Sequence, residues 1–370
     1  MWSRGAGLVL SASFAALVGL VSPTAARAEE ATELLGPLRI RDMTPFNILR
    51  LDMLPAHAVV GGRGSWAIEA DVSYTNTFVM SKNVMAYLEQ RGDRRPLTQD
   101  DVDALFALGE DAYYVDGEVG LLDLTFHYAL APRTSVYFTL PIYSFRGGFV
   151  DGTIESFHSF IGNATDGRDL VARDHFQTVL SLHGLQTAFL EAPMDGGIGD
   201  PVIGLRHYWG LGASRWGVVL DGAAKFAVRG ERSLLSTGSN DFGLQASLQG
   251  KFHRQGIYFG ASFVLTDGRV FGVKLGSRVV PTATAAYEVG LTRHTNFILQ
   301  LYASESALRD TSIEEIRTNK YQASLGLRSR HGHMIYGFAV TENVANFENT
   351  PDVGASLIFA WVSLQPLNGP

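Results

Sequence analysis

Long stretches of the chain alternate apolar and polar side chains with a period of two residues, the pattern of a β-strand with one apolar face. In residues 66–80, WAIEADVSYTNTFVM, the apolar face carries Trp66, Ile68 and Val72, whereas Glu69 and Asp71 lie on the opposite face. Strands of soluble sandwiches average about five or six residues, but a strand that crosses a bilayer at a tilt needs about 9–11. The length of the pattern therefore favours a barrel that spans a membrane.

The same alternation recurs often enough to predict a strand number. We predict twelve strands, at residues 65–80, 113–129, 134–145, 198–209, 215–229, 240–253, 256–266, 279–293, 295–304, 318–330, 332–342 and 352–362. Their connections are alternately long and short, as in bacterial barrels with long outer loops and short periplasmic turns. A strand-like pair at 176–192 keeps this order only as a hairpin inside the 146–197 connection. The predicted fold is all-β: a transmembrane antiparallel up-and-down β-barrel of about twelve strands over residues 61–370, with ten or fourteen as alternatives.

The polar faces of these strands are expected to line the barrel lumen, because the apolar faces must meet lipid. The predicted lumen-lining residues are Glu69, Asp71, Asp123, His127, Arg206, Asp221, Lys225, Arg229, Lys251, Glu288 and Arg328. Their mixed charges have two compatible interpretations. Opposite charges can pair and fill a narrow interior, or they can line a polar path for small solutes. Aromatic residues near strand ends, such as Trp66, Trp216 and Tyr258, are typical of the girdles at membrane surfaces.

The first residues indicate export. Arg4, the apolar run from Ala6 to Val21 and the small-residue site Ala26-Arg27-Ala28 predict a cleaved signal peptide over residues 1–28. The apolar run is shorter than the ~20 residues of a spanning helix, which disfavours a membrane anchor. We expect the cell outer membrane as the location. Residues 29–60 contain three prolines and no sustained period, so we predict a strap that lies in the periplasm or inside the lumen.

The composition narrows the class of protein further. The sequence contains no cysteine, so it has no disulfide, no thiolate metal site and no lipid attachment site. Without residues 1–28 the chain has 28 basic and 37 acidic residues, a net charge of −9. An acidic chain with scattered positive charge is unsuited to nucleic acid, which we exclude as a partner.

Two outer loops, 81–112 and 146–197, are expected to carry amphipathic helices. In the first, Thr98 is a candidate N-cap for a short helix. In the second, Asp151 can cap a helix that ends at Gly162. Its apolar stripe consists of Val150, Ile154, Phe157 and Ile161. The barrel mouth, the 176–192 hairpin and the lipid surface are the three candidates for covering this stripe.

No pattern predicts an active site, a metal or a cofactor. His127 shares a polar face with Asp123, but it lies near the periplasmic end and no G-x-S-x-G or matching serine accompanies it. His158, His175 and His183 match no metal-ligand spacing. The stretch GIGD at 197–200 lacks the context of a dinucleotide loop and more simply allows a bend before a strand. We therefore predict no catalytic, cofactor-binding or metal-binding residue.

Four ordered blocks of the sequence are similar to a known family. They are DGEVGLLDLTFHYALAPRTSVYFTLPIY (116–143), GGFVDGTIESFHSFIG leading to DGRD, GIGDPVIGLRHY, and TENVANFENTPDVGASLIF (341–359). The chain resembles the uncharacterised exported Gram-negative proteins catalogued as domain of unknown function 3187. The resemblance implies a predicted outer-membrane barrel and brings no activity or substrate.

The most favoured function is a narrow channel, or a binding protein for a small polar or charged solute, with a lumen gated or plugged by loops. The first alternative is a closed structural barrel that contacts outer-leaflet lipid or a partner through its loop helices. A lipid-modifying enzyme such as a hydrolase is third. The expected partners are outer-membrane lipid, the barrel-assembly machinery and a small solute, and the chain is expected to be monomeric or weakly oligomeric.

Overall fold

The computed structural model describes residues 33–56, 62–161, 167–230, 234–270, 272–274, 279–346 and 353–363, all within one compact unit, Thr32–Pro370. The predicted signal peptide and Gly162 lie outside the described residues. No helix in the described part of the chain is long and apolar enough to cross a membrane.

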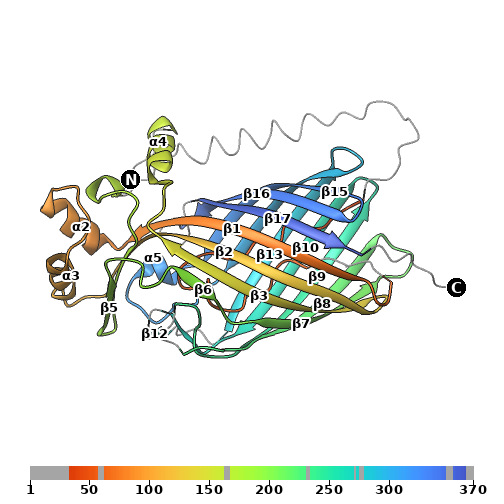
Figure 1. Ribbon diagram of the computed structural model, residues 1–370, viewed down its shortest axis with the longest axis horizontal. Coiled ribbons are helices and arrows are strands. Elements are labelled where there is room, and N and C mark those ends of the chain that lie inside the picture. The colour runs from red at the N-terminus through yellow and green to blue at the C-terminus, as the bar shows by residue number, and fades with distance from the viewer. Residues whose placement is uncertain are drawn as a thin grey trace. The chain divides into compact units, whose positions relative to one another are not determined.

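Twelve antiparallel strands of the described residues close into a ring (Figure 1). They are β1 (Trp66–Met80), β2 (Ala112–Ala131), β3 (Thr134–Arg146), β7 (Val202–Gly210), β8 (Trp216–Lys225), β9 (Asp241–Phe252), β10 (Gln255–Leu265), β13 (Val279–Gly290), β14 (Thr295–Ser304), β15 (Lys320–His331), β16 (Met334–Ala345) and β17 (Val353–Val362). Each pairs with the next, and β17 pairs with β1. Closure leaves no unpaired edge in the wall, which a bilayer requires. The predicted barrel and its twelve strands are confirmed.

The two faces of the wall differ in burial as the alternation predicts. In β9, Phe242 and Leu244 are 52% and 71% exposed, whereas Gln245, Ser247 and Gln249 are buried. The exposed apolar face is the one that lipid would cover, so the lumen receives the polar side chains.

Two strands differ from their predicted bounds by four residues at one end, more than any other wall strand. The strand expected at 198–209 is split into β6 (Gly196–Ile198) and β7, both paired with β3. At Gly196 the backbone has φ +145°, and a Cβ would lie 2.1 Å from the carbonyl oxygen of Tyr143, so only glycine fits. Strand β8 ends at Lys225, because beyond it the amides of Ala227 and Val228 donate to the side chains of Asn240 and Asp200 instead of to a neighbouring strand.

The long connections carry the remaining elements. The hairpin β4 (Gln177–Leu182) and β5 (Leu185–Phe189) extends the outer end of β2, and the 310 helix η1 (Arg168–Leu170) precedes it. A small pair, β11 (Arg269–Val270) and β12 (Val273–Lys274), and the short helix α5 (Glu314–Arg317) lie in later loops. The first two loops hold α2 (Lys82–Arg91), α3 (Gln99–Phe106) and α4 (Asp151–Ile161). Helix α2 was not expected from the sequence.

Helices α2 and α3 form a lobe on the outward face of the extended β1–β2 hairpin. Leu88 and Leu105 from the helices pack with Phe78, Met80 and Tyr114 from the strands. These strand residues have the same parity as the lipid-facing residues lower in β1 and β2. The lobe therefore covers apolar strand surface that extends beyond the bilayer.

Asp101 fixes the start of α3. Its carboxylate accepts hydrogen bonds from the amide and hydroxyl of Thr98, from Tyr87 and from Arg95. Burial opposes the ionisation of Asp101, but these bonds outweigh it and hold the pKa of the carboxyl well below its usual range. A depressed pKa stabilises the lobe above about pH 4, and this contribution is lost as the pH falls from there.

We expect Asp101→Asn to lower the local free energy of unfolding of the lobe by about 2 kcal/mol, because it weakens the cap and removes one of the two carboxylates that bind Arg95, the other being Asp93. Amide hydrogen exchange in 102–106 measures this change. Asp103→Asn is the control, because Asp103 is exposed and its side chain bonds only to the Gln99 amide among described contacts. Equal exchange in the two variants would contradict the assignment.

The tryptophans of the described residues are concentrated at the short-turn end of the barrel. The four tryptophans of the described residues, Trp66, Trp209, Trp216 and Trp361, all lie near that end of their strands. The rings of Trp66 and Trp361 are 4.6 Å apart. Tyr258 does not belong to the girdle, since it is buried and its hydroxyl donates to Glu288 in the lumen.

Candidate functional site: the barrel lumen and its internal hairpin

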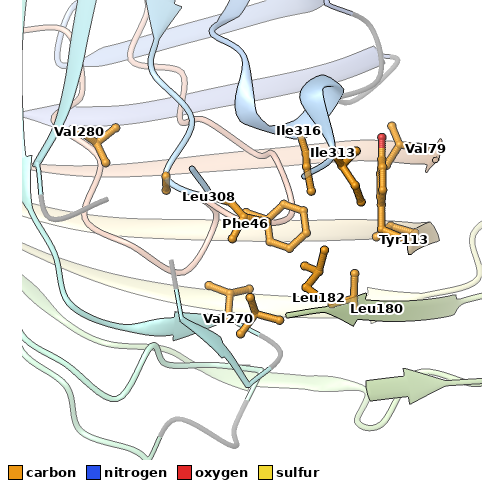
Figure 2. Close-up of a cluster of buried hydrophobic side chains, with 13 residues drawn as sticks. Phe46, Val79, Tyr113, Leu180, Leu182, Val270, Val280, Leu308, Ile313 and Ile316 are labelled. Atoms are coloured by element: carbon orange, nitrogen blue, oxygen red, sulfur yellow. The ribbon is translucent and has the colours of Figure 1, made fainter. Parts of the chain in front are cut away.

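Residues 33–56, which we call the plug, thread the lumen as a hairpin. At the short-turn end, the amides of Leu35 and Gly36 donate to Glu288 at 2.7 and 3.0 Å. At the outer end, Phe46 packs in an apolar cluster with loop residues such as Leu182 and Ile316 (Figure 2). The returning arm bonds to β9, where Asp241 accepts from the Leu51 amide. The plug therefore rises through the lumen to its outer mouth and turns back.

Side chains, rather than a ladder of backbone bonds, hold the two arms together. The amides of Asn47 and Ile48 donate to the Thr44 carbonyl and close the turn. Arg41 donates to the carbonyls of Ile48 and Arg50 across the hairpin, and the Asp42 amide donates to Asp52. This explains why residues 29–60 showed no sustained period in the sequence.

Charged groups fasten the plug to the wall. Arg39 pairs with Glu69 at 3.3 Å, and Arg41 with Asp123 at 3.2 Å. At the outer end Asp42 pairs with Lys320, which is fully buried. Because both members of each pair are buried, losing one would leave an uncompensated charge in the lumen.

The predicted lumen residues divide by partner. Glu69 and Asp123 bind plug side chains, Glu288 accepts plug amides, and Arg328 donates to the Leu35 carbonyl at 2.8 Å. Two pairs lie within the wall: Arg206 with Asp221 at 2.7 Å, and Lys225 with Asp241 at 3.0 Å. Lys225 also donates to the Leu49 carbonyl of the plug.

The other predicted lumen residues are placed as follows. Asp71 and His127 are buried in the lumen, and Lys251 is half-buried near its short-turn end. Arg229 does not line the lumen, because β8 ends at Lys225 and Arg229 is exposed beyond it. In the sequence, the alternation of apolar and polar residues continues as far as Arg229, beyond the end of the strand at Lys225.

A group of acidic side chains faces the plug arginines. Asp71 and Asp123 are directly opposite each other on β1 and β2, and Glu69 follows on the same face. The Ser73 hydroxyl donates to Asp71. Asp123 forms an ion pair with Arg41, and Glu69 forms one with Arg39. The plug thus supplies the positive charge for an acidic region of the wall.

Two small cavities lie beside the plug, each lined by described residues. One is lined by residues including Arg39, Arg41, Asp52, Asp123 and Arg206, the other by residues including Ser73, Gln322 and Ser356. Each has a volume of about 20 Å³, enough for one or two water molecules. In this conformation they admit water but no larger solute.

Sequence reasoning missed Arg39, Arg41, Asp42 and Lys320 as lumen residues. A signal existed for Arg39, Arg41 and Lys320, but not for Asp42. Leu38, Arg39, Ile40 and Arg41 alternate like a strand, and Lys320 has the parity of Gln322, Ser324 and Arg328 on β15.

Nothing in the described residues supports catalysis or metal binding at these positions. Nδ1 of His127 has no hydrogen-bond partner among the described residues, so the orienting contact of a triad is missing there. Within the described ranges, no group of three or more His, Cys, Asp or Glu side chains is arranged to hold a metal ion.

Helix α4 is anchored on the outward face of the wall. Glu118, which has the parity of the lipid-facing Leu122 and Phe126, accepts the amides of Phe149 and Val150. Asp151 does not cap the helix through its side chain as expected; its carboxylate binds Arg168, Asn76 and the Asp174 amide.

Of the predicted apolar stripe, Ile154 is buried and Val150 half-buried, whereas the side chains of Phe157 and Ile161 lie outside the described residues. The β4–β5 hairpin, by contrast, covers the barrel mouth, where Leu180 and Leu182 contact the Phe46 cluster. The 146–197 connection therefore covers two places: its helix α4 lies on the outward face of the wall, and its β4–β5 hairpin covers the barrel mouth.

A family model described as "Protein of unknown function (DUF3187)" matches residues 12–361. The chain belongs to this family. The resemblance expected from the sequence blocks is thus confirmed, and the plugged lumen described above is the structure of a DUF3187 member. No curated protein matches the sequence significantly.

Solved barrels are similar in fold. The COG4313 outer membrane channel from Pseudomonas putida F1 has 12% identity and a TM-score of 0.50, over 85% of this chain and 100% of that chain. The NanC porin (9% identity, TM-score 0.39, 67% and 94% of the chains) and the P. putida toluene transporter TodX (8%, 0.36, 83% and 92%) are more distant and carry no argument. At such identities the first likeness shows a shared fold alone.

Proposed function

We propose that this DUF3187 protein is an outer-membrane channel for small polar or charged solutes, and that the plug holds its lumen closed in the conformation described above. The plug's attachment to the wall is the observation that carries this proposal. Leu38, Leu51 and Met53 add apolar contacts, but charged and hydrogen-bonding groups fasten the plug along its length. Such contacts can be exchanged for water and solute, whereas a continuous apolar core would close the lumen permanently.

The proposed location follows from the same features. The predicted signal peptide provides export, and the closed wall with its apolar outer face suits insertion by the barrel-assembly machinery. The short turns would face the periplasm and the loop helices the outside. No catalytic role is included in this proposal.

A disulfide lock tests whether the plug gates the channel. A Cβ on Gly243 would lie 2.8 Å from Cγ of Met53, the position that a cysteine sulfur would take in Met53→Cys. The native chain has no cysteine, so the pair Met53→Cys and Gly243→Cys would have no competing thiol. We expect the oxidised variant in planar bilayers to lose conductance and the reduced variant to regain it.

Two results would contradict the proposal. Equal conductance before and after reduction would show that the plug does not gate. Absence of conductance and of solute uptake in liposomes, in native and reduced protein alike, would exclude a channel. The second result would favour a closed structural barrel, an alternative that the filled lumen also supports. The single variant Met53→Cys, treated identically, controls for oxidation without a lock.

A further inference from the structure

Four of the five short turns of the barrel carry an arginine, and none of the five carries a carboxylate. The five turns comprise residues 132–133, 211–215, 253–254, 291–294 and 332–333. Their ionisable side chains are Arg133, Arg215, His253, Arg254, Arg293, His294 and His333, and none of the five contains Asp or Glu. By contrast, the 81–111 connection at the opposite end contains seven acidic and four basic residues. A chain that is acidic as a whole therefore has one basic rim.

This basic rim lies directly beside the tryptophan girdle. His333 stacks on Trp361 with ring centroids 5.2 Å apart, and the ring centroids of His207 and Trp209 are 4.1 Å apart. Arg215 immediately precedes Trp216 and is exposed, as are Arg133 and Arg293. Tryptophan prefers the boundary between hydrocarbon and headgroups, so the rim lies at the level of the phosphate groups.

We propose that the short-turn rim binds the anionic headgroups of the phospholipid leaflet that surrounds it. A soluble acidic partner would be met by a basic patch on one side. Here the arginines come from four of the five turns, spaced around the ring, which matches a planar layer of phosphates. Arginine is suited to this role because its planar guanidinium can bind two phosphate oxygens together. The inference needs the barrel and its orientation, but it does not depend on whether the lumen conducts.

Lipid binding by the full-length refolded protein tests the proposal. The variant carries Arg133→Gln, Arg215→Gln, Arg254→Gln and Arg293→Gln. The control carries Arg146→Gln, Arg173→Gln, Arg309→Gln and Arg317→Gln, four exposed arginines at the opposite end. The probe is fluorescent phosphatidylglycerol competing with phosphatidylcholine in mixed micelles, and heat-modifiable migration on gels verifies that each barrel is folded.

Each basic residue near an anionic surface contributes roughly fivefold to binding before screening by salt. We expect the short-turn variant to lose at least about tenfold of its preference for phosphatidylglycerol and the control to lose less than about threefold. Unchanged preference in the short-turn variant would overturn the proposal. So would an unchanged lipid preference accompanied by lost binding of a soluble polyglutamate, which would assign the rim to an acidic periplasmic partner. An equal loss in both variants would likewise overturn it, because only total charge would then matter.

Discussion

Replacing Lys320 by methionine should raise the open probability of the refolded channel by about a hundredfold. Lys320 is fully buried, and its ammonium binds the carboxylate of Asp42 and the hydroxyl of Thr44 near the turn of the plug. Removing one member of a buried ion pair costs about 3–5 kcal/mol, because the other charge remains without compensation. A loss of about 2.7 kcal/mol, just below this range, already shifts the ratio of released to docked plug a hundredfold.

Single-channel recording measures the open probability, and hydrogen exchange at residues 38–46 measures release of the plug independently. Lys274→Met is the matched control, since the Lys274 pair with Asp267 is largely exposed at 3.7 Å and contributes little. The double variant Asp42→Asn with Lys320→Met should recover part of the closed state, because it removes both buried charges. Faster exchange without increased opening would mean that the plug can loosen without gating.

The barrel wall could be predicted from the sequence because lipid and lumen impose opposite demands on alternate residues. Phe242 and Leu244 must face hydrocarbon, whereas Gly243 and Gln245 must face the interior, so the pattern persists for the whole crossing. The alternation of long and short connections then favoured twelve strands over ten or fourteen. Strand ends were less certain where polar loop residues continued the alternation, and Arg229 was misplaced for this reason.

The plug's contacts with the wall could not be predicted residue by residue from the sequence. Beyond the short alternation at residues 38–41 the plug has no sustained period, because its bonds go to wall residues that are distant in sequence, such as Glu288 and Asp241. The wall charges indicated that a partner was needed, but two interpretations were open: pairing within the wall or a solute path. Arg206 with Asp221 follows the first interpretation, whereas Glu69 and Asp123 pair with the plug, a third arrangement.

Helix positions show a related limit. The apolar stripe of α4 was evident in the sequence. The position of the helix on the wall, however, depends on Glu118, a carboxylate on the lipid-facing side of β2 that accepts the amides just before the helix. An outward-facing acid in a membrane strand is costly unless it is covered and hydrogen-bonded. The loop supplies that cover, and this requirement could have located the helix.

The double variant Arg39→Gln with Arg41→Gln should make the open channel about tenfold more selective for cations over anions. It removes two positive charges from the lumen and leaves Glu69, Asp71 and Asp123 together on adjacent strands. A change of several kT in the local potential of a narrow lumen alters the partition of small ions by roughly this factor. The reversal potential in a KCl gradient measures the selectivity.

Two further variants separate this charge effect from simple loosening of the plug. Adding Asp71→Asn and Asp123→Asn to the double variant should return the selectivity toward the native value while the plug remains released, because the loss of two negative charges then balances the loss of two positive ones. Arg309→Gln with Arg317→Gln removes the same charge from exposed loop positions and should leave selectivity almost unchanged. If the double variant opens the channel but keeps native selectivity, solutes pass along another side of the lumen, and the acidic region serves only to seat the plug.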